Sequence, residues 1–290
     1  MRFSVIVPFL NEERYIARCI LALQSQRVPQ SEVELIFVDN GSVDASAEVV
    51  RRYADVRLVT QVDIPHNVYA SRNRGAELAS GDILAFTDAD CAPVPAWLAE
   101  IEAGMLSTGA QLVLGRRIFP AGVSRALRLF ETYENAKAEY VVGCGERRFL
   151  FGFGNNMAIR RNVFEELGGF AELPLCGDTE MVQRYIEKRS DAQVTYLDGM
   201  CIEHLEVTTV MAWLKKIKTY GAHNRQVKAI RHRYENLPLQ AKIEIARRCA
   251  QKNGLGVIST AGFLLLLAIG NLFYALGTLA RPVSFKSSGA

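Results

Sequence analysis

The sequence predicts an α/β fold in which a mostly parallel sheet is flanked by helices, and three observations support that prediction. Short continuous apolar runs alternate with segments of helical periodicity through the first third of the chain. Such alternation is typical of a parallel sheet whose strands are buried on both faces. Pro8 closes the first run, Asp39 the second, and Asp88 stands two residues after the run 83–86. Polar side chains follow the run ends, at the edge where open α/β sheets bind ligands.

The elements are predicted in order from these patterns. The expected strands, each an apolar run bounded by turn-forming residues, are 3–7, 35–38, 56–60, 83–86 and 194–196. The expected helices, which carry apolar residues at helical spacing, are 16–23, 44–53, 73–79 and a helix that begins near Asp178. The apolar run at the start is short and charged residues follow it, so we expect a strand there and not a signal peptide.

The composition is that of a globular protein, with 49% hydrophobic and 22% charged residues. Residues 1–204 carry 21 basic and 28 acidic side chains, whereas residues 205–253 carry 11 basic and 3 acidic ones. This asymmetry favours a protein of the membrane surface over one that binds nucleic acid. The six cysteines are scattered without a Cys-x-x-Cys pair, which favours a reducing compartment and argues against a structural zinc site.

Carboxylates stand where two of the predicted strands end. Asp88 and Asp90 come just after strand 83–86, and Asp39 comes directly after strand 35–38. Two carboxylates one residue apart can face one divalent cation such as Mg²⁺ or Mn²⁺, which also binds substrate phosphates. The alternative is a solvated acidic turn. A Gly-x-Gly-x-x-Gly motif and a Gly-x-x-x-x-Gly-Lys-Ser/Thr motif are both absent, which argues against a dinucleotide cofactor and an NTPase.

An ordered series of motifs resembles that of the family 2 glycosyltransferases with the GT-A fold. The matching segments are 4–13, 35–44, 70–76, 86–91, 152–161, 168–170 and 177–181. The resemblance implies a GT-A, Rossmann-like sheet and the transfer of a sugar from a nucleotide-sugar to an acceptor hydroxyl, with inversion at the anomeric carbon. It also implies a divalent metal, Mn²⁺ or Mg²⁺, as the cofactor.

The resemblance implies a role for individual residues as well. The residues expected around the nucleotide-sugar are Pro8, Phe9, Asn11, Glu12, Asp39, Arg72 and Asp88. Asp88 and Asp90 are expected to hold the metal and the donor diphosphate, and Asp178 is the expected general base. His204 is the candidate third metal ligand, and a structural or exposed histidine is the alternative. For Arg72 the alternative is a charge that faces solvent.

The region around Asp178 departs from the family pattern. Family members often have Glu-Asp here, whereas this chain has Gly177-Asp178, so Glu180 is the fallback base or an acceptor contact. Asp178 could instead be the N-cap of the helix that follows. Asn155 and Asn156 are expected under the acceptor, with ordinary turn chemistry as the alternative.

The missing acid leaves a second hypothesis open, a non-catalytic nucleotide-sugar-binding membrane protein of the same fold. A nucleotidyltransferase would need a glycine-rich, arginine-containing loop after the first strand. Residues 8–11 are Pro-Phe-Leu-Asn instead, which argues against that class.

The chain after the catalytic region is predicted to reach a membrane. We expect a catalytic domain at 1–205, a basic amphipathic neck at 206–253, a transmembrane helix at 254–280 and a short tail at 281–290. Residues 254–280 contain no charged side chain, and a helix of that length exceeds the roughly 30 Å hydrocarbon core of a bilayer.

The apolar face of the neck, around Trp213 and Ile217, would suit an anionic bilayer surface, and packing against the catalytic domain is the alternative. More basic residues precede the apolar helix than follow it, which favours a catalytic domain in the cytoplasm and a place on the inner membrane.

The expected acceptor is a lipid-linked saccharide or a polyprenyl phosphate, used in the synthesis of cell-surface polysaccharide or glycolipid. One apolar span and the absence of Gln-x-x-Arg-Trp argue against a processive polysaccharide synthase.

Overall fold

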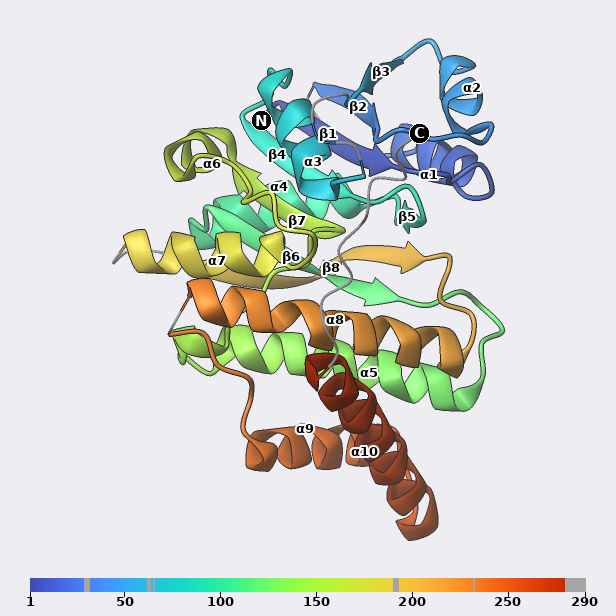
Figure 1. Cartoon of the computed structure of the whole chain (residues 1–290), viewed down its shortest axis with the longest axis vertical. Helices are drawn as coiled ribbons and strands as arrows, with labels where there is room; N and C mark the ends of the chain where they lie inside the picture. Colours follow the sequence, from blue (N-terminus) through green and yellow to red (C-terminus); the bar gives the residue numbers. More distant parts are fainter. Residues whose placement is uncertain (29–31, 62–63, 65, 190–192, 232, 280–290) are drawn as a thin grey trace. The chain divides into compact units, whose positions relative to one another are not determined.

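The computed structural model describes residues 1–28, 32–61, 64, 66–189, 193–231 and 233–279 (Figure 1). These residues form two compact units. The first consists of Met1–Ile118 and Phe151–Glu206, and the second consists of Phe119–Leu150 together with residues 207–279. Residues Phe119–Leu150 thus group with the C-terminal helices.

The first unit is built on one sheet of eight strands in the order β3-β2-β1-β4-β7-β6-β8-β5. The strands are β1 Phe3–Phe9, β2 Val33–Asp39, β3 Val56–Thr60, β4 Ile83–Thr87, β5 Cys91–Pro93, β6 Leu112–Ile118, β7 Asn156–Arg160 and β8 Val194–His204. The pairs β1–β2, β1–β4 and β2–β3 are parallel. The pairs β4–β7, β6–β7 and β5–β8 are antiparallel. The predicted α/β fold is confirmed, and the second half of the sheet makes it a mixed one.

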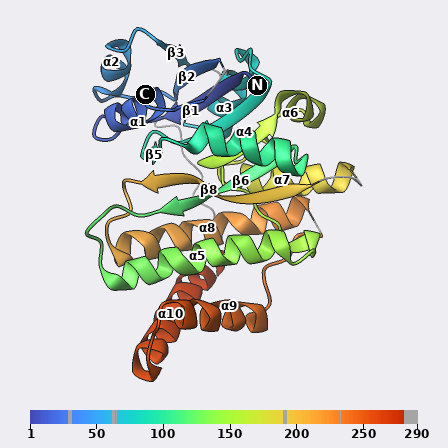
Figure 2. The ribbon, with the colours of Figure 1, turned by 180° about the vertical axis from the view of Figure 1, so that it is seen from behind.

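Helices cover both faces of this sheet. The helices of the first unit are α1 Ile16–Gln24, α2 Ser46–Arg51, α3 Val68–Glu77, α4 Trp97–Thr108, α6 Arg161–Leu167 and α7 Gly177–Lys188. Phe3 and Val5 of β1 join a core with buried residues of α1, α2 and α4. On the other face Ile6 meets α3, where a Cβ at Gly75 would lie 2.5 Å from Ile6. Helix α3 lies on the side of the sheet turned to the viewer in Figure 1, and α4 on the side turned to the viewer in Figure 2.

Helix α3 begins five residues earlier than the predicted 73–79. The reason is a cap, because the side chain of Asn67 accepts hydrogen bonds from the backbone N–H groups of Tyr69 at 2.9 Å and Ala70 at 3.0 Å. The earlier start places both Tyr69 and Arg72 on the helix, three residues apart, so their side chains share one face.

The strand order reverses at β1, because β2 and β3 lie on one side of it and β4 lies on the other. Phe9 at the end of β1 pairs with Asp39 at the end of β2, so these two strands end level with each other. Asp88 follows β4 at the same edge. Such a switch point is where open α/β sheets hold ligands.

The second unit is helical. Its elements are α5 Arg125–Gly143, the short 3₁₀ helix η1 Arg147–Phe149, α8 Val210–Ile230, α9 Leu239–Lys252 and α10 Val257–Leu279. Helices α5 and α8 run side by side in both views (Figures 1 and 2). Helix α8 also packs closely on α10, because a Cβ at Gly277 would lie 2.0 Å from the carbonyl oxygen of Lys218.

The apolar face of α8 is buried inside this unit. The ring of Trp213 lies 5.4 Å from that of Phe119, and Ile217 lies close to Gly270 of α10. The apolar face of the neck therefore packs within the second unit, and its contact with a bilayer or with the catalytic domain stays a prediction. By its length and composition α10 could cross a membrane, and most of the residues in its apolar stretch are not buried.

Candidate active site

The loops after β1 and β2 are tied together by side chains. Asn11, whose φ is 57°, accepts a hydrogen bond from the backbone N–H of Val43 at 2.9 Å. Asp39 Oδ1 accepts from the N–H groups of Ser42 at 2.8 Å and Gly41 at 3.2 Å. Asp39 Oδ2 has no hydrogen-bond partner among the described residues. Asp39 is therefore held in place with one oxygen left to accept from a ligand.

The other residues expected on the donor side have structural contacts. Pro8 and Phe9 are buried in β1, where the ring of Phe9 packs 6.5 Å from that of Phe37. The carbonyl oxygen of Phe9 accepts from the N–H of Asn40 at 2.9 Å. The N–H of Glu12 donates to Ser46 Oγ at 2.7 Å, which joins the first loop to α2. These contacts fix the end of β1 and the loop after it beside Asp39.

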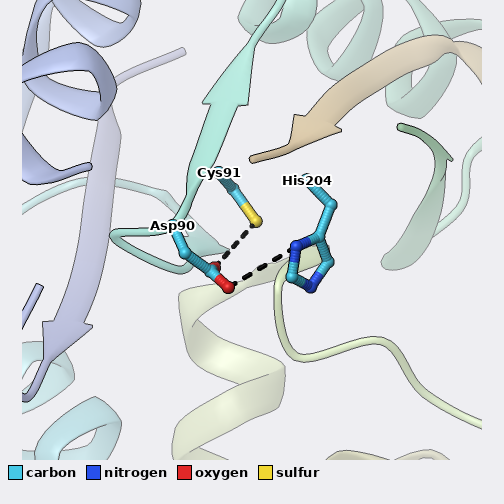
Figure 3. Close-up of side chains that lie close together, drawn as sticks. All are labelled: Asp90, Cys91 and His204. Carbon is cyan, nitrogen blue, oxygen red and sulfur yellow. Dashed lines mark hydrogen bonds and ion pairs between the residues drawn. The ribbon is translucent and has the colours of Figure 1, made fainter. Parts of the chain in front are cut away.

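A cluster of possible metal ligands lies where β5 pairs with β8 (Figure 3). His204 Nδ1 lies 3.5 Å from Asp90 Oδ2, and Cys91 Sγ donates to Asp90 Oδ1 at 3.3 Å. One ligand atom from each residue lies within 4.8 Å of the others. The backbone N–H of Leu205 donates to the carbonyl oxygen of Asp90 at 2.8 Å, which keeps the two strands in register.

The donor set of this cluster suits a divalent transition metal. Asp90 offers an oxygen and His204 an imidazole nitrogen, a combination that suits Mn²⁺ better than Mg²⁺, which prefers oxygen ligands alone. Burial raises the pKa of the Cys91 thiol well above its ordinary value, and the charge of Asp90 adds to that effect. Asp90 and His204 offer the oxygen and nitrogen donors that fit such an ion, and the Cys91 thiol lies beside them.

The two carboxylates of the Asp-x-Asp motif have different partners. Asp90 lies with His204, whereas Asp88 Oδ1 accepts from Arg72 Nη2 at 2.5 Å. Arg72 is only 3% exposed, so it is not the solvent-facing charge of the alternative interpretation. A Cβ at Gly154 would lie 2.5 Å from Arg72 Nη1, so the guanidinium occupies space that only a glycine leaves.

Arg72 is held as a cation. Its guanidinium lies 5.3 Å from the ring centroid of Tyr69 and 5.9 Å from that of Phe170. Burial acts to lower the pKa of Arg72, but Asp88, Tyr69 and Asp178 together outweigh it, so the pKa lies above its ordinary value. A fixed positive charge therefore stands beside Asp88.

Asp178 lies in the first turn of α7, partly exposed, and each of its oxygens accepts hydrogen bonds. Oδ2 accepts from the N–H of Gly154 at 2.7 Å, and Oδ1 accepts from the N–H of Thr179 at 2.8 Å and from the hydroxyl of Tyr69 at 3.1 Å. The N-cap of α7 is Cys176, so Asp178 is not the N-cap that the alternative proposed.

The structure gives a steric reason for the glycine before Asp178. A Cβ at Gly177 would lie 2.8 Å from the carbonyl oxygen of Ala171 and 2.9 Å from the ring of Tyr69. Atoms at these distances overlap. Tyr69 therefore occupies the space that the missing acidic side chain would need.

The three residues expected near the acceptor differ in their surroundings. Glu180 is 2% exposed and pairs with Arg184 at 2.8 Å. Asn156 is fully buried, and its side chain accepts from Trp97 Nε1 at 2.8 Å and donates to two backbone carbonyl oxygens. Asn155 is partly exposed, with Nδ2 3.8 Å from Cys91 Sγ beside the metal cluster. Of these three, only Asn155 lies at the site without a full set of structural partners.

The sequence missed four residues that build this site, namely Tyr69, Gly154, Phe170 and Cys91. Tyr69 stands three residues before Arg72, and that helical spacing was the one signal available. Its partner Asp178 is 109 residues away in the sequence. No local pattern reports a contact over that separation.

Three comparisons place this geometry among known proteins. Residues 4–168 match the model of glycosyl transferase family 2. The chain is 35% identical over 172 residues to "Glycosyltransferase AglE" of Haloferax volcanii, across 58% of this chain and 55% of that protein. It is 27% identical over 183 residues to "Glucosyl-dolichyl phosphate glucuronosyltransferase" of the same organism, across 59% of this chain and 56% of that protein.

This chain therefore spans about half the length of these two relatives. The fold matches the mannosyltransferase PcManGT from Pyrobaculum calidifontis, solved with GDP-Man and Mn²⁺, with a TM-score of 0.60 and 18% identity over 95% of this chain and 84% of that one. The family match covers more than half of the chain and includes both α3 and the Asp-x-Asp turn after β4. The chain belongs to glycosyl transferase family 2.

Proposed function

We propose that the chain transfers a sugar from a nucleotide-sugar to an acceptor hydroxyl, with Asp178 as the general base. One observation carries the proposal. Helix α3 contacts a carboxylate on each side of the site, because Arg72 pairs with Asp88 at 2.5 Å and Tyr69 bonds Asp178 at 3.1 Å. The candidate base and the Asp-x-Asp motif thus belong to a single constellation, as a one-site transfer requires.

The reaction is a single in-line displacement. The acceptor oxygen forms a bond to the anomeric carbon while the bond between that carbon and the diphosphate oxygen breaks, and the hydroxyl proton passes to Asp178. Attack from the face opposite the leaving group inverts the anomeric centre. Asp39 is placed to accept a hydrogen bond from the nucleoside, and Arg72 puts a fixed cation near the negative charge of the donor.

Asp90 and His204 are the residues proposed to hold a divalent cation, with Mn²⁺ favoured, and Asp88 is proposed to take part in binding the diphosphate. A cation bound there would neutralise the charge that develops on the departing nucleoside diphosphate. The donor set on β5 and β8 supports this assignment, as does the Mn²⁺ found with GDP-Man in the mannosyltransferase of the same fold.

We further propose a membrane-bound acceptor, either a lipid-linked saccharide or a polyprenyl phosphate, and attachment to the inner membrane through α10 with the catalytic unit in the cytoplasm. The support is the exposed apolar surface of α10 and the relative whose name includes a dolichyl phosphate. Synthesis of cell-surface polysaccharide or glycolipid would use such a product.

The test measures nucleoside diphosphate release by the full chain in membranes, from a panel of UDP- and GDP-sugars with Mn²⁺ or Mg²⁺. Asp178→Asn should reduce turnover by at least about a hundredfold, as expected for loss of a general base, while calorimetry should show that nucleoside diphosphate binding is kept. Asp198→Asn is the matched control, because Asp198 is exposed and, among the described residues, its ion pair is with Arg116. Full turnover in Asp178→Asn would refute the assignment. Tight binding with no transfer to any acceptor in membrane extracts would favour the non-catalytic alternative.

A further inference from the structure

Tyr69 forms a hydrogen bond with the candidate base Asp178. Its side chain is 3% exposed, and its hydroxyl donates to Asp178 Oδ1 at 3.1 Å. The ring is fixed on three sides. The Arg72 guanidinium lies 5.3 Å from its centroid, the Phe170 ring 5.5 Å away, and Gly177 approaches so closely that no side chain fits there. The hydroxyl therefore has little freedom to leave the carboxylate.

The hydroxyl can act only as a donor to this carboxylate. Burial raises the pKa of Tyr69 well above its ordinary value, and the charge of Asp178 raises it further, so the phenol keeps its proton. A neutral phenol beside an ionised carboxylate donates one hydrogen bond to it. That bond favours the charged form of the carboxylate, which is the form a base needs.

The two oxygens of Asp178 are not equivalent. Oδ1 accepts two hydrogen bonds, from Tyr69 and from the N–H of Thr179, whereas Oδ2 accepts one, from the N–H of Gly154. A carboxylate oxygen has about two lone-pair sites. Oδ1 is therefore filled within the protein, and Oδ2 keeps one lone pair for an incoming proton.

We propose that Tyr69 is a positioning residue that saturates Asp178 Oδ1, so that Oδ2 is the atom that receives the acceptor proton. This inference rests on the proposed function, since it takes Asp178 as the base. It concerns the orientation and charge of the base, because Tyr69 itself touches neither the donor nor the acceptor in this scheme.

The test is Tyr69→Phe, which keeps the ring and its packing and removes only the hydroxyl. We expect kcat to fall by roughly tenfold with the donor KM unchanged, because the Arg72–Asp88 pair stays in place. We also expect the acidic limb of the kcat/KM profile to move up by roughly one pH unit, because the charged base loses a donor.

The difference between the acidic limbs of Tyr69→Phe and the wild type should report the base, because the two enzymes share the same metal ligands. The other titratable groups that face Asp178 are Arg72 and Cys176. Burial raises the pKa of the Cys176 thiol far above its ordinary value, and the pKa of Arg72 is also raised, so both keep one protonation state across the neutral range.

Tyr185→Phe is the matched control. Tyr185 is fully buried on α7, the helix that carries Asp178, and its hydroxyl lies 3.4 Å from the carbonyl oxygen of Gln193. The same atom is removed from a buried tyrosine, but Asp178 keeps its hydrogen bonds from Tyr69, Thr179 and Gly154. This variant should keep the wild-type kcat and pH profile.

Three results would separate the hypotheses. Wild-type kcat and pH profile in Tyr69→Phe, with Asp178→Asn inactive, would overturn the role of Tyr69 and leave the proposed function standing. A lower kcat with an unmoved acidic limb would also overturn it, because a general structural loss would produce that result. Full turnover in Asp178→Asn would instead refute the proposed function itself.

Discussion

The glycine that precedes the candidate base offers a sharp test of the packing around it. A Cβ at Gly177 would lie 2.8 Å from the carbonyl oxygen of Ala171 and 2.9 Å from the ring of Tyr69. Neither neighbouring atom can move away without a cost in free energy. The first is backbone, and the second is a buried ring held by Arg72 and Phe170. Gly177→Ala should therefore disturb both the fold and the contact between Tyr69 and Asp178.

The expected cost follows from two opposing contributions. Overpacking a tight site typically costs about 1–3 kcal/mol, whereas replacing Gly by Ala inside a helix gains up to about 1 kcal/mol. The gain is smaller here because Gly177 is the first residue of α7. We expect a net loss of about 1–2 kcal/mol in the free energy of unfolding, which corresponds to a thermal midpoint lowered by about 3–6 °C.

The assay follows thermal unfolding and turnover of the full chain in detergent. Gly143→Ala is the matched control, because Gly143 ends α5 and a Cβ there would meet nothing within 4 Å. That variant should be as stable as the wild type or slightly more so. If Gly177→Ala displaces Tyr69, its turnover should fall and adding Tyr69→Phe should lower it little further, since both changes remove the same contact. Wild-type stability and turnover in Gly177→Ala would refute this reasoning, and would leave the missing acidic side chain without a steric explanation.

Two further predictions concern the metal and the stability at low pH. His204→Gln should weaken Mn²⁺ binding by roughly tenfold or more, measured by electron paramagnetic resonance of the ion without any substrate, and an unchanged affinity would exclude His204 as a ligand. The second prediction concerns Glu34. Burial acts to raise the pKa of its carboxyl group, but the hydrogen bonds that it accepts from Ser4 and Ser80 outweigh burial, so the pKa is lowered. Its stabilising contribution is present above the unfolded-state pKa and is lost as pH falls through the folded value. Glu34→Gln should therefore unfold more easily than the wild type near neutral pH, with the difference shrinking in acid, and a difference independent of pH would contradict this.

The parallel half of the sheet was predictable from the sequence because its signal is local. Strands buried on both faces leave continuous apolar runs, and the predicted 83–86 and 56–60 agree closely with β4 Ile83–Thr87 and β3 Val56–Thr60. The antiparallel strands β6 and β7 were not predicted. Leu112–Ile118 has Gly-Arg-Arg before its last residue and Asn156–Arg160 starts with an asparagine, so neither shows a clear apolar pattern.

The site was predictable in part. Asp39, Asp88 and Asp90 could be named because they follow predicted strands, where the sheet's own geometry gathers ligand-binding groups, whereas Asp178 was named from the family resemblance. The residues that contact those carboxylates could not be named from the sequence. Asn156 looks like a turn residue in the sequence, yet it is fully buried and bonds Trp97 from a helix 59 residues away.

The sequence by itself indicated the family, the parallel strands along the chain and the candidate carboxylates Asp39, Asp88, Asp90 and Asp178, since these depend on short motifs and on the period of apolar residues. Only the tertiary structure decided that Asp90 lies with His204 while Asp88 pairs with Arg72, and that Tyr69 reaches Asp178. The physical reason is that a side chain's partner is chosen by which segments pack together. Side-chain direction and close packing are properties of the folded chain, and no stretch of sequence encodes them alone.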